Sequence, residues 1–366
     1  MKTFFSIAVL TSIFLVSCQL FDFSVNKDTD DQELIKPEPL QFEQLAYSNS
    51  PGYYATDYWM DGEKGFASIS DGKIIKTTDG FKTRSEITLN KPEGFPTSSS
   101  IIPLSIFFLD ETNGWIGCKS FSNFNSIIYR TTDGGDNWTP HIITSSEQAV
   151  FDVKDVYFTT EDRGYLTTDN ATFKDIIYTT TDGGLNWTEH PLPNIGAVYK
   201  RIHFFDENNG MLLGNTTYKG VALITSDGGV TWTQLKPDGN NFGSVGIMGI
   251  HVTDSNNYYL FGSTGFVIKR SDGGVTWQEI NITNCNQEVG DIYFTDSNTG
   301  YACASNAGYF YITQDGGITW HRQIVYESLN QSFINIYIHN KNLYLLGTSS
   351  QLSAKVGYMI YKAILP

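Results

Sequence analysis

The sequence TSDGGVTW, residues 225–232, decides the fold, because variants of it recur along the chain. The other well-formed copies are TTDGGDNW (131–138), TTDGGLNW (180–187), RSDGGVTW (270–277) and TQDGGITW (313–320), and a degraded copy, TTDGFKTR (77–84), precedes them. Successive aspartates are 54, 49, 45, 45 and 43 residues apart. A period near 45 residues indicates one supersecondary unit that is repeated.

Each repeat has the pattern of four short strands. In the sixth, the segments 291–296, 301–305, 309–313 and 319–324 alternate apolar and polar residues or are continuously apolar, and turn residues separate them. Four short antiparallel strands per repeat are typical of a propeller blade. The first strands of the units are expected at 58–61, 105–110, 155–160, 201–206, 249–254, 291–296 and 335–340. The sequence therefore predicts an all-β chain that forms a single seven-bladed β-propeller.

The last unit has only three strand patterns, at 334–338, 343–347 and 357–364. A blade without its fourth strand would leave an open edge, which invites aggregation. The segment LQFEQLA (40–46) resembles the fourth strands of other units, with Phe42 where they have Trp. We therefore expect this N-terminal strand to complete the last blade and close the ring.

The N-terminus has the pattern of an export signal. Lys2 precedes an apolar stretch over 4–16, and LVSC (15–18) resembles the bacterial lipobox. That resemblance implies that Cys18 becomes the acylated N-terminus; Gln19 follows it, not the Asp that often retains lipoproteins at the inner membrane. We expect residues 1–17 to be a signal peptide, 18–38 a flexible acidic tether and 39–366 the propeller. The expected location is the bacterial cell envelope, at the periplasmic or surface side of the outer membrane.

Charge and cysteine content restrict the partners. The net charge of −15 disfavours nucleic acid and anionic lipid, so membrane contact is expected only through the lipid anchor. Besides Cys18, the chain has Cys118, Cys285 and Cys303. Cys285 and Cys303 could form a bridge, but buried thiols are favoured because Cys118 and Cys303 lie in apolar strand sequences. No spacing of Cys and His suggests a metal, and no cofactor is expected.

The repeated phrase resembles the Asp-box, or bacterial neuraminidase repeat. Its Asp can accept N–H groups within the turn, its glycines permit positive φ, and its Trp covers the apolar face of the blade. Six turn carboxylates spread over a ring cannot converge on one substrate, so we interpret them as structural. The first copy lacks the second Gly and the Trp, which predicts a looser outer edge for that blade. The residues assigned this structural role are Asp79, Asp133, Asp182, Asp227, Asp272, Asp315, Trp138, Trp187, Trp232, Trp277 and Trp320.

The function is predicted from a second resemblance. Residues 106–115 (IFFLDETNGW), 156–165 (VYFTTEDRGY) and 292–301 (IYFTDSNTGY) resemble single propellers of the photosystem II assembly-factor type. This implies a protein-binding scaffold without catalytic residues. The alternative is a glycan-binding or glycoside-hydrolysing propeller with the sialidase fold. The six arginines are scattered over the predicted turns and strands, which argues against a convergent arginine cluster of the sialidase kind.

Two candidate sites remain. Loops opposite the boxes carry aromatic residues that could contact a protein or glycan, or could pack against their own loops: Phe121, Phe124, Phe173, Tyr199, Tyr218 and Phe242. The first strands place polar residues where they could face a central channel and bind a small ligand, or could pair and pack between blades: Asp155, Arg201, His203, His251 and Asp291. We expect a monomer.

Overall fold

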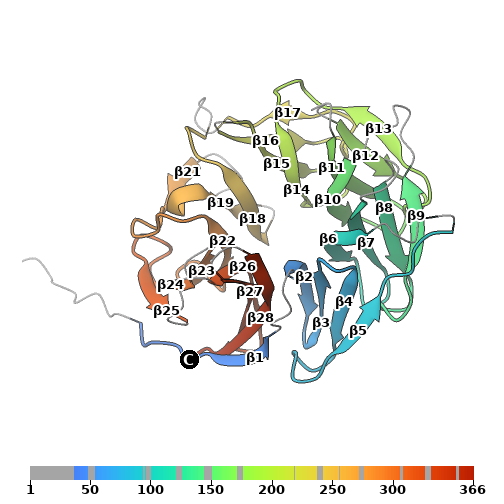
Figure 1. Ribbon diagram of the computed structural model, residues 1–366. Coiled ribbons are helices and arrows are strands. Elements are labelled where there is room, and N and C mark those ends of the chain that lie inside the picture. The colour runs from blue at the N-terminus through green and yellow to red at the C-terminus, as the bar shows by residue number, and fades with distance from the viewer. Residues whose placement is uncertain are drawn as a thin grey trace, which may run out of the picture. The chain divides into compact units, whose positions relative to one another are not determined.

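A computed structural model (Figure 1) describes residues 37–47, 54–93, 95, 100–120, 126–143, 151–170, 176–217, 219–236, 242–254, 256–271, 276–305, 308–325, 331–351 and 354–366. The chain divides into residues 1–36 and the unit Pro37–Pro366, and all described residues belong to the second. This unit consists of seven four-stranded antiparallel sheets in a ring (Figure 1). The predicted seven-bladed, all-β propeller is confirmed.

The strands of blades 1 to 6 follow one another from the channel outward. Blade 1 contains β2 (Ala55–Asp61), β3 (Lys64–Ile69), β4 (Lys73–Thr77) and β5 (Ser85–Thr88). Blade 2 contains β6 (Ile101–Phe108), β7 (Gly114–Ser120), β8 (Ser126–Thr131) and β9 (Thr139–Ile143). Blade 3 contains β10 (Phe151–Phe158), β11 (Gly164–Asn170), β12 (Ile176–Thr180) and β13 (Thr188–Pro191). Blade 4 contains β14 (Val198–Phe204), β15 (Gly210–Asn215), β16 (Gly220–Thr225) and β17 (Thr233–Gln234). Blade 5 contains β18 (Ile247–Asp254), β19 (Asn257–Gly262), β20 (Val267–Ser271) and β21 (Thr276–Glu279). Blade 6 contains β22 (Val289–Phe294), β23 (Gly300–Ala304), β24 (Tyr309–Thr313) and β25 (His321–Ile324).

Blade 7 combines the two ends of the described chain. Its sheet has the order β1–β28–β27–β26, with β26 (Gln331–His339), β27 (Asn342–Gln351), β28 (Ala354–Ile364) and β1 (Glu43–Tyr47). The structure places β1 at Glu43–Tyr47, a few residues later than the expected 40–46, and Glu43 pairs with Lys362. Phe42 packs edge-on against Phe310 of blade 6, with ring centroids 5.4 Å apart.

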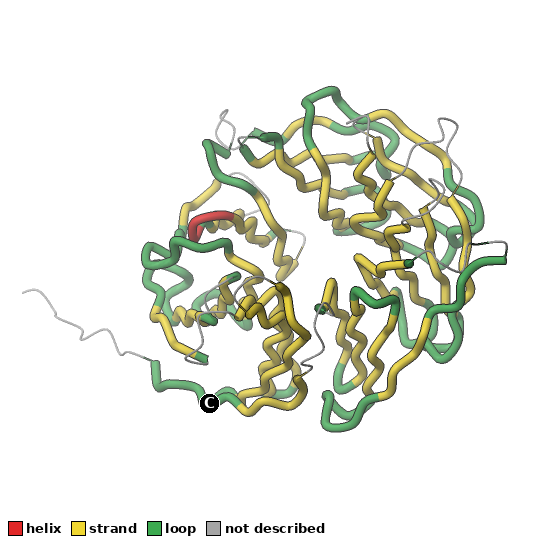
Figure 2. Tube along the Cα trace, viewed as in Figure 1, coloured by secondary structure: helices red, strands yellow, loops and turns green. Residues whose placement is uncertain are grey.

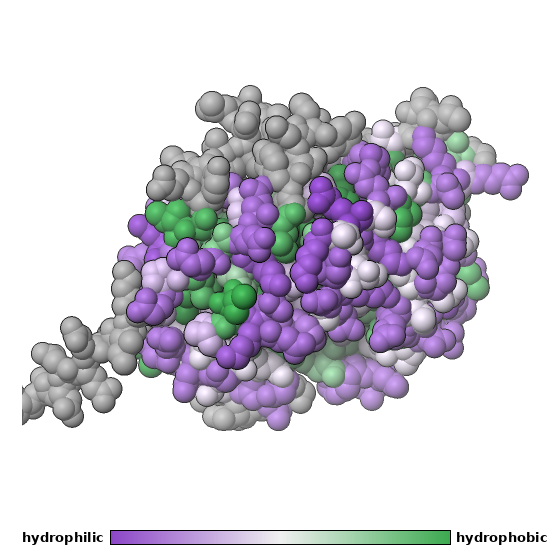
Figure 3. Space-filling view, turned by 90° about the horizontal axis from the view of Figure 1, so that it is seen from below, coloured by the Kyte–Doolittle hydropathy of each residue, from purple (hydrophilic) through white to green (hydrophobic). Residues whose placement is uncertain are grey.

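Strands account for nearly all regular structure, and the short 3-10 helix η2 (Ser263–Gly265) is the red segment in Figure 2. In the described part of the chain, no helix is long and apolar enough to span a membrane. The surface seen in Figure 3 is mainly hydrophilic, with apolar residues in small separate groups.

The apolar core lies between the blades. The described residues form seven buried clusters, and each contains residues of two neighbouring blades. Between blades 2 and 3, for example, Trp115 stacks on Phe158 with ring centroids 3.6 Å apart. Alternate strand residues point to opposite faces of a sheet, so each blade contributes to the cluster on either side. Neighbouring blades therefore stabilise one another all around the ring.

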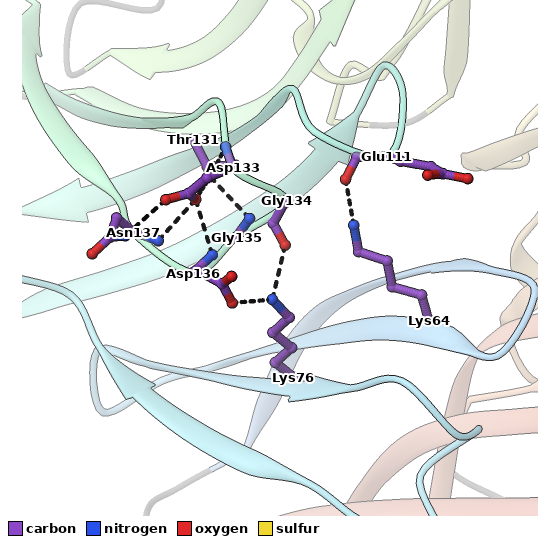
Figure 4. A network of polar contacts seen from close by, with 9 residues as sticks. All are labelled: Lys64, Lys76, Glu111, Thr131, Asp133, Gly134, Gly135, Asp136 and Asn137. Carbon is purple, nitrogen blue, oxygen red and sulfur yellow. Dashed lines mark hydrogen bonds and ion pairs between the residues drawn. The ribbon is translucent and has the colours of Figure 1, made fainter.

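The Asp-boxes form the turns between third and fourth strands (Figure 4). In the second box, the Asp133 carboxylate accepts the backbone N–H of Asn137 at 2.9 Å and its side-chain amide at 2.7 Å. The Thr131 hydroxyl donates to Asp133 and accepts the N–H of Gly135. These bonds, chiefly the N–H of Asn137, lower the pKa of Asp133 to about 2. Four other boxes have the same bond from the residue four positions later to Asp79, Asp182, Asp227 and Asp315.

The box tryptophans pack at the blade interfaces. Trp187 and Trp232 donate their indole N–H to the second glycine of their own box, and Trp320 donates to Ile280 O of blade 5, each at 3.0 Å. Trp138 is buried between blades 1 and 2, and Trp277 packs edge-on against Tyr258. Asp272 lies outside the described residues.

The degraded first box is packed by a different residue. Phe81 occupies the position of the second glycine with φ of 64°, and its side chain is fully buried against blade 7. Its ring contributes to the interface with the preceding blade, as Trp does in other boxes, and β5 remains paired with β4. Phe81 thus supplies an apolar contact that Arg84 cannot, and the looser outer edge expected for this blade stays a prediction.

Candidate functional site: the central channel

The first strands of all seven blades share a register irregularity of one extra residue relative to the second strand. Such a bulge re-aims the side chains that follow it. The residues directly after it are Asp57, Ser105, Asp155, Arg201, Gly249, Asp291 and Asn335. Because the seven first strands surround the axis of the ring (Figure 1), these equivalent positions form one ring, which includes the predicted Asp155, Arg201 and Asp291.

Three carboxylates of this ring hold neighbouring blades together. Asp57 accepts the backbone N–H of Ile106 in blade 2, Asp155 that of Ile202 in blade 4, and Asp291 that of Ile336 in blade 7, each at 2.9 Å. Each carboxylate thus accepts an N–H group from the first strand of the following blade. The prediction missed Asp57, although its position before Tyr58 matches that of Asp155 before Val156.

Arg201 is the cation among these carboxylates. Its guanidinium lies 3.9 Å from Asp155, and Asp57 and Asp291 also attract it. The Arg201 side chain is 41% exposed although it comes from one of the innermost strands. Burial raises the pKa of Asp155 and of Asp291 to about 7, and Arg201 opposes this rise. The structure thus brings Asp155, Arg201 and Asp291 together and adds Asp57.

The predicted histidines lie two residues further along their strands, in a belt of rings between blades. His251 Nε2 accepts the backbone N–H of Phe294 at 3.1 Å, and its ring centroid lies 4.8 Å from that of Tyr293. His203 contacts Tyr157 with ring centroids 5.4 Å apart. Burial lowers the pKa of both histidines to about 4, so both are neutral at pH 7. His203 and His251 therefore pack between blades, which is the second of the two alternatives.

Only two of the predicted aromatic loop residues are described, and both are buried. Tyr199 is 3% exposed in the interface of blades 3 and 4, and Phe242 is 7% exposed in that of blades 4 and 5. Their assignment to an exposed binding face is wrong, because each ring fills an interface instead of facing solvent. Phe121, Phe124, Phe173 and Tyr218 lie outside the described residues.

A group of cations lies toward the face opposite the boxes. Lys119 is near the end of β7 at that face, and its ammonium lies 3.0 Å from Asp152, which also pairs with Lys154 at 3.1 Å. Lys154 and the exposed Lys200 are the extra residues of the bulges before Asp155 and Arg201. Sequence reasoning missed these lysines, although Lys154 directly precedes Asp155 and Lys200 directly precedes Arg201.

The charged residues of this ring interact through hydrogen bonds to backbone N–H groups and through the ion pair of Arg201 with Asp155. Among the described residues, no group of three or more Cys, His, Asp or Glu could hold a metal ion. The described cysteines, Cys118, Cys285 and Cys303, are free and buried, as the apolar strand sequences predicted.

Comparisons with known proteins agree with this architecture. The BNR/Asp-box repeat model matches residues 311–322, and no curated protein sequence matches the chain. The solved structure "YCF48 bound to D1 peptide" is similar with a TM-score of 0.65 and 16% identity, over 91% of this chain and 99% of that one. A catalytically inactive virginiamycin B lyase from Staphylococcus aureus with quinupristin has a TM-score of 0.65 and 13% identity, over 89% of this chain and 100% of that one.

A GH74 enzyme from Niastella koreensis is also similar, with a TM-score of 0.60 and 14% identity, over 87% of this chain and 55% of that one. Identities this low show a shared fold and no shared activity. Seven blades, repeated box turns and this set of structures agree with one another. The chain is therefore a single seven-bladed β-propeller, and its residues 311–322 match the Asp-box repeat.

Proposed function

We propose that this protein is a non-catalytic lipoprotein of the bacterial cell envelope, and that its propeller binds an acidic segment of a protein partner on the face opposite the Asp-boxes. The observation that carries the proposal is Arg201. Among the described residues its guanidinium has a single ion pair, at 3.9 Å, although it can donate five N–H groups. The adjoining Lys200 is exposed. Together they offer positive charge beside the channel of a protein with a net charge of −15.

Binding is favoured over hydrolysis by the state of the channel carboxylates. A glycosidase of the usual kind needs two carboxyl groups available to its substrate. Asp57, Asp155 and Asp291 instead accept N–H groups of neighbouring strands. The similarity in fold to YCF48, whose structure contains a D1 peptide, supports a polypeptide as ligand. The glycan-binding alternative has no comparable contact in its favour among the described residues.

The partner is tested by affinity capture from an envelope extract. Lys200→Glu should lose the partner that the unchanged protein retains, because it reverses a charge beside Arg201. Lys82→Glu is the matched control: Lys82 is also an exposed lysine, but it lies in the first Asp-box on the other face. Equal recovery by the Lys200 variant would contradict the proposed face.

The envelope location rests on Cys18 and is tested separately. Cys18→Ala should abolish labelling by a radioactive fatty acid and move the protein from the membrane to the soluble fraction. A variant that stays acylated, or that stays with the membrane in the same amount, would contradict the lipid anchor.

A further inference from the structure

Blade 5 departs from other blades at the start of its second strand. In blades 2, 3, 4 and 6, a phenylalanine of the first strand pairs in register with a glycine of the second strand. These pairs are Phe108 with Gly114, Phe158 with Gly164, Phe204 with Gly210, and Phe294 with Gly300. Blade 5 instead has Val252 opposite Tyr258. The aromatic ring of this pair thus comes from the second strand, and it carries a hydroxyl group.

The third strand of blade 5 carries a second departure, directly beside Tyr258. Arg270 pairs in register with Tyr258 and begins the box, at the position where the other boxes have Thr. Its guanidinium donates to the Tyr258 oxygen, and its Cζ lies 5.4 Å from the ring centroids of Tyr258 and of Trp277. Tyr258 is 2% exposed, and none of the described residues accepts its O–H group. This hydroxyl can therefore donate to a ligand in the groove that Tyr258 lines.

The facing wall, in blade 4, lacks the groups that close the groove between blades 1 and 2 (Figure 4). In blade 1, Phe66 stacks on a ring of blade 2, and Lys76 bonds to the box turn of blade 2. Met211 and Ile224 pair in register at the equivalent positions of blade 4 and offer neither an aromatic ring nor a cation. A cavity of about 450 Å³ lies here between blades 4 and 5, on the box face.

The two walls of this cavity carry opposite charges. Asp206 of blade 4 and Arg270 of blade 5 are the charged groups among the described residues that line it. Asp206 accepts the side-chain amide of Asn209 at 2.8 Å and the N–H groups of Asn208 and Asn209, and these bonds hold its pKa below the ordinary value. All of its bonds lie within its own turn, and none comes from Arg270. A carboxylate has about four acceptor sites, so Asp206 can accept a further donor.

We propose that the groove between blades 4 and 5 binds a free α-amino acid with a large apolar side chain. The α-carboxylate bonds to Arg270 and to the Tyr258 hydroxyl, and the α-ammonium bonds to Asp206. The apolar side chain packs on Phe205 and Ile224, which line the same cavity and are half-buried. A zwitterion suits both walls, whereas an anion would be repelled by Asp206 and a cation by Arg270. This site lies on the box face and does not depend on the binding face proposed above.

The test is a calorimetric titration of the full chain with L-leucine and with two analogues that each lack one charge, N-acetyl-L-leucine and L-leucinamide. Leucine should bind about tenfold more tightly than either analogue, because each analogue loses a hydrogen bond between charged groups. Glycine should bind more weakly than leucine, because it has no apolar side chain to bury. Equal affinity of leucine and either analogue, or no binding of leucine and of L-phenylalanine, would overturn the proposal.

Substitutions on the two walls localise the binding. Arg270→Met should abolish the preference for leucine over leucinamide, since it removes the partner of the carboxylate. Tyr258→Phe keeps the ring and should reduce the same preference severalfold with little change in Tm. Asp206→Asn should instead abolish the preference for leucine over N-acetyl-leucine. Each wall thus has its own readout, which a general loss of stability would not reproduce.

The matched control is Asp110→Asn. Asp110 accepts the N–H groups of Thr112 and Asn113 in the first hairpin of blade 2, as Asp206 does in its own turn, but it does not line the cavity. This variant should change the Tm about as much as Asp206→Asn and leave leucine binding unchanged. Unchanged preferences in both the Arg270 and Asp206 variants would assign leucine to another surface and refute the site, whatever the Lys200 experiment shows.

Discussion

At the residue scale, aspartate has two opposite electrostatic roles in this ring. In the box, N–H donors surround Asp133 near the solvent and lower its pKa to about 2. In the channel, Asp155 also accepts N–H groups, but burial dominates and raises its pKa to about 7. Burial removes the water that would stabilise the charge, whereas hydrogen bonds favour the charged form.

The titration of Asp155 makes stability depend on pH. Its pKa in the folded protein lies above the ordinary value of 3.8, so the folded state favours the protonated form. The stabilising contribution is therefore complete below about pH 4 and is lost as the pH rises through about 7. Because of this site, we expect the free energy of unfolding to decrease by on the order of 2 kcal/mol when the pH rises from 5 to 8.

Urea unfolding at these two pH values measures the effect. Asp155→Asn should be less stable than the unchanged protein at pH 5, since it loses one acceptor, and should show a smaller decrease between the two pH values. The same decrease in both proteins would place the titration elsewhere, with Asp291 as the next site to substitute.

At the scale of elements, each blade depends on contacts that its own strands do not supply. Blade 7 takes its outer strand, β1, from the beginning of the described chain, and Phe42 reaches from there to blade 6. Blade 1 replaces the missing Trp of its box with Phe81. The repeat therefore tolerates changes in its consensus where another ring fills the same interface.

The contribution of the N-terminal segment can be measured by substitution. Phe42→Ala should lower the free energy of unfolding by about 2 kcal/mol, because it empties part of the interface between blades 6 and 7. Glu43→Ala, at an exposed neighbouring position, should change it by less than about 0.5 kcal/mol. Deletion of residues 40–46 should be more severe than either, and an unchanged Tm after this deletion would show that β1 contributes nothing to the ring.

At the scale of the whole molecule, the seven interface clusters join every blade to two neighbours, so we expect the ring to unfold as one unit. The three buried thiols report on this from blade 2, from blade 6 and from the connection between blades 5 and 6. In a chain that begins at Gln19, Cys118, Cys285 and Cys303 should be unreactive toward a thiol reagent in the folded state. Burial also raises the pKa of Cys118 and Cys303, which keeps them protonated. All three should become reactive at the same urea concentration, and separate transitions would show that blades unfold independently.

The sequence by itself determined the repeat, the number of blades and the box turns, because these follow from local spacing and turn chemistry. It also placed Asp155, Arg201 and Asp291 at equivalent strand positions. Only the tertiary structure brought Asp57 to the same ring and buried Tyr199 and Phe242. These outcomes depend on contacts between blades some 45 residues apart or on opposite sides of the ring. A local pattern does not contain such distances, and closure of the ring sets them.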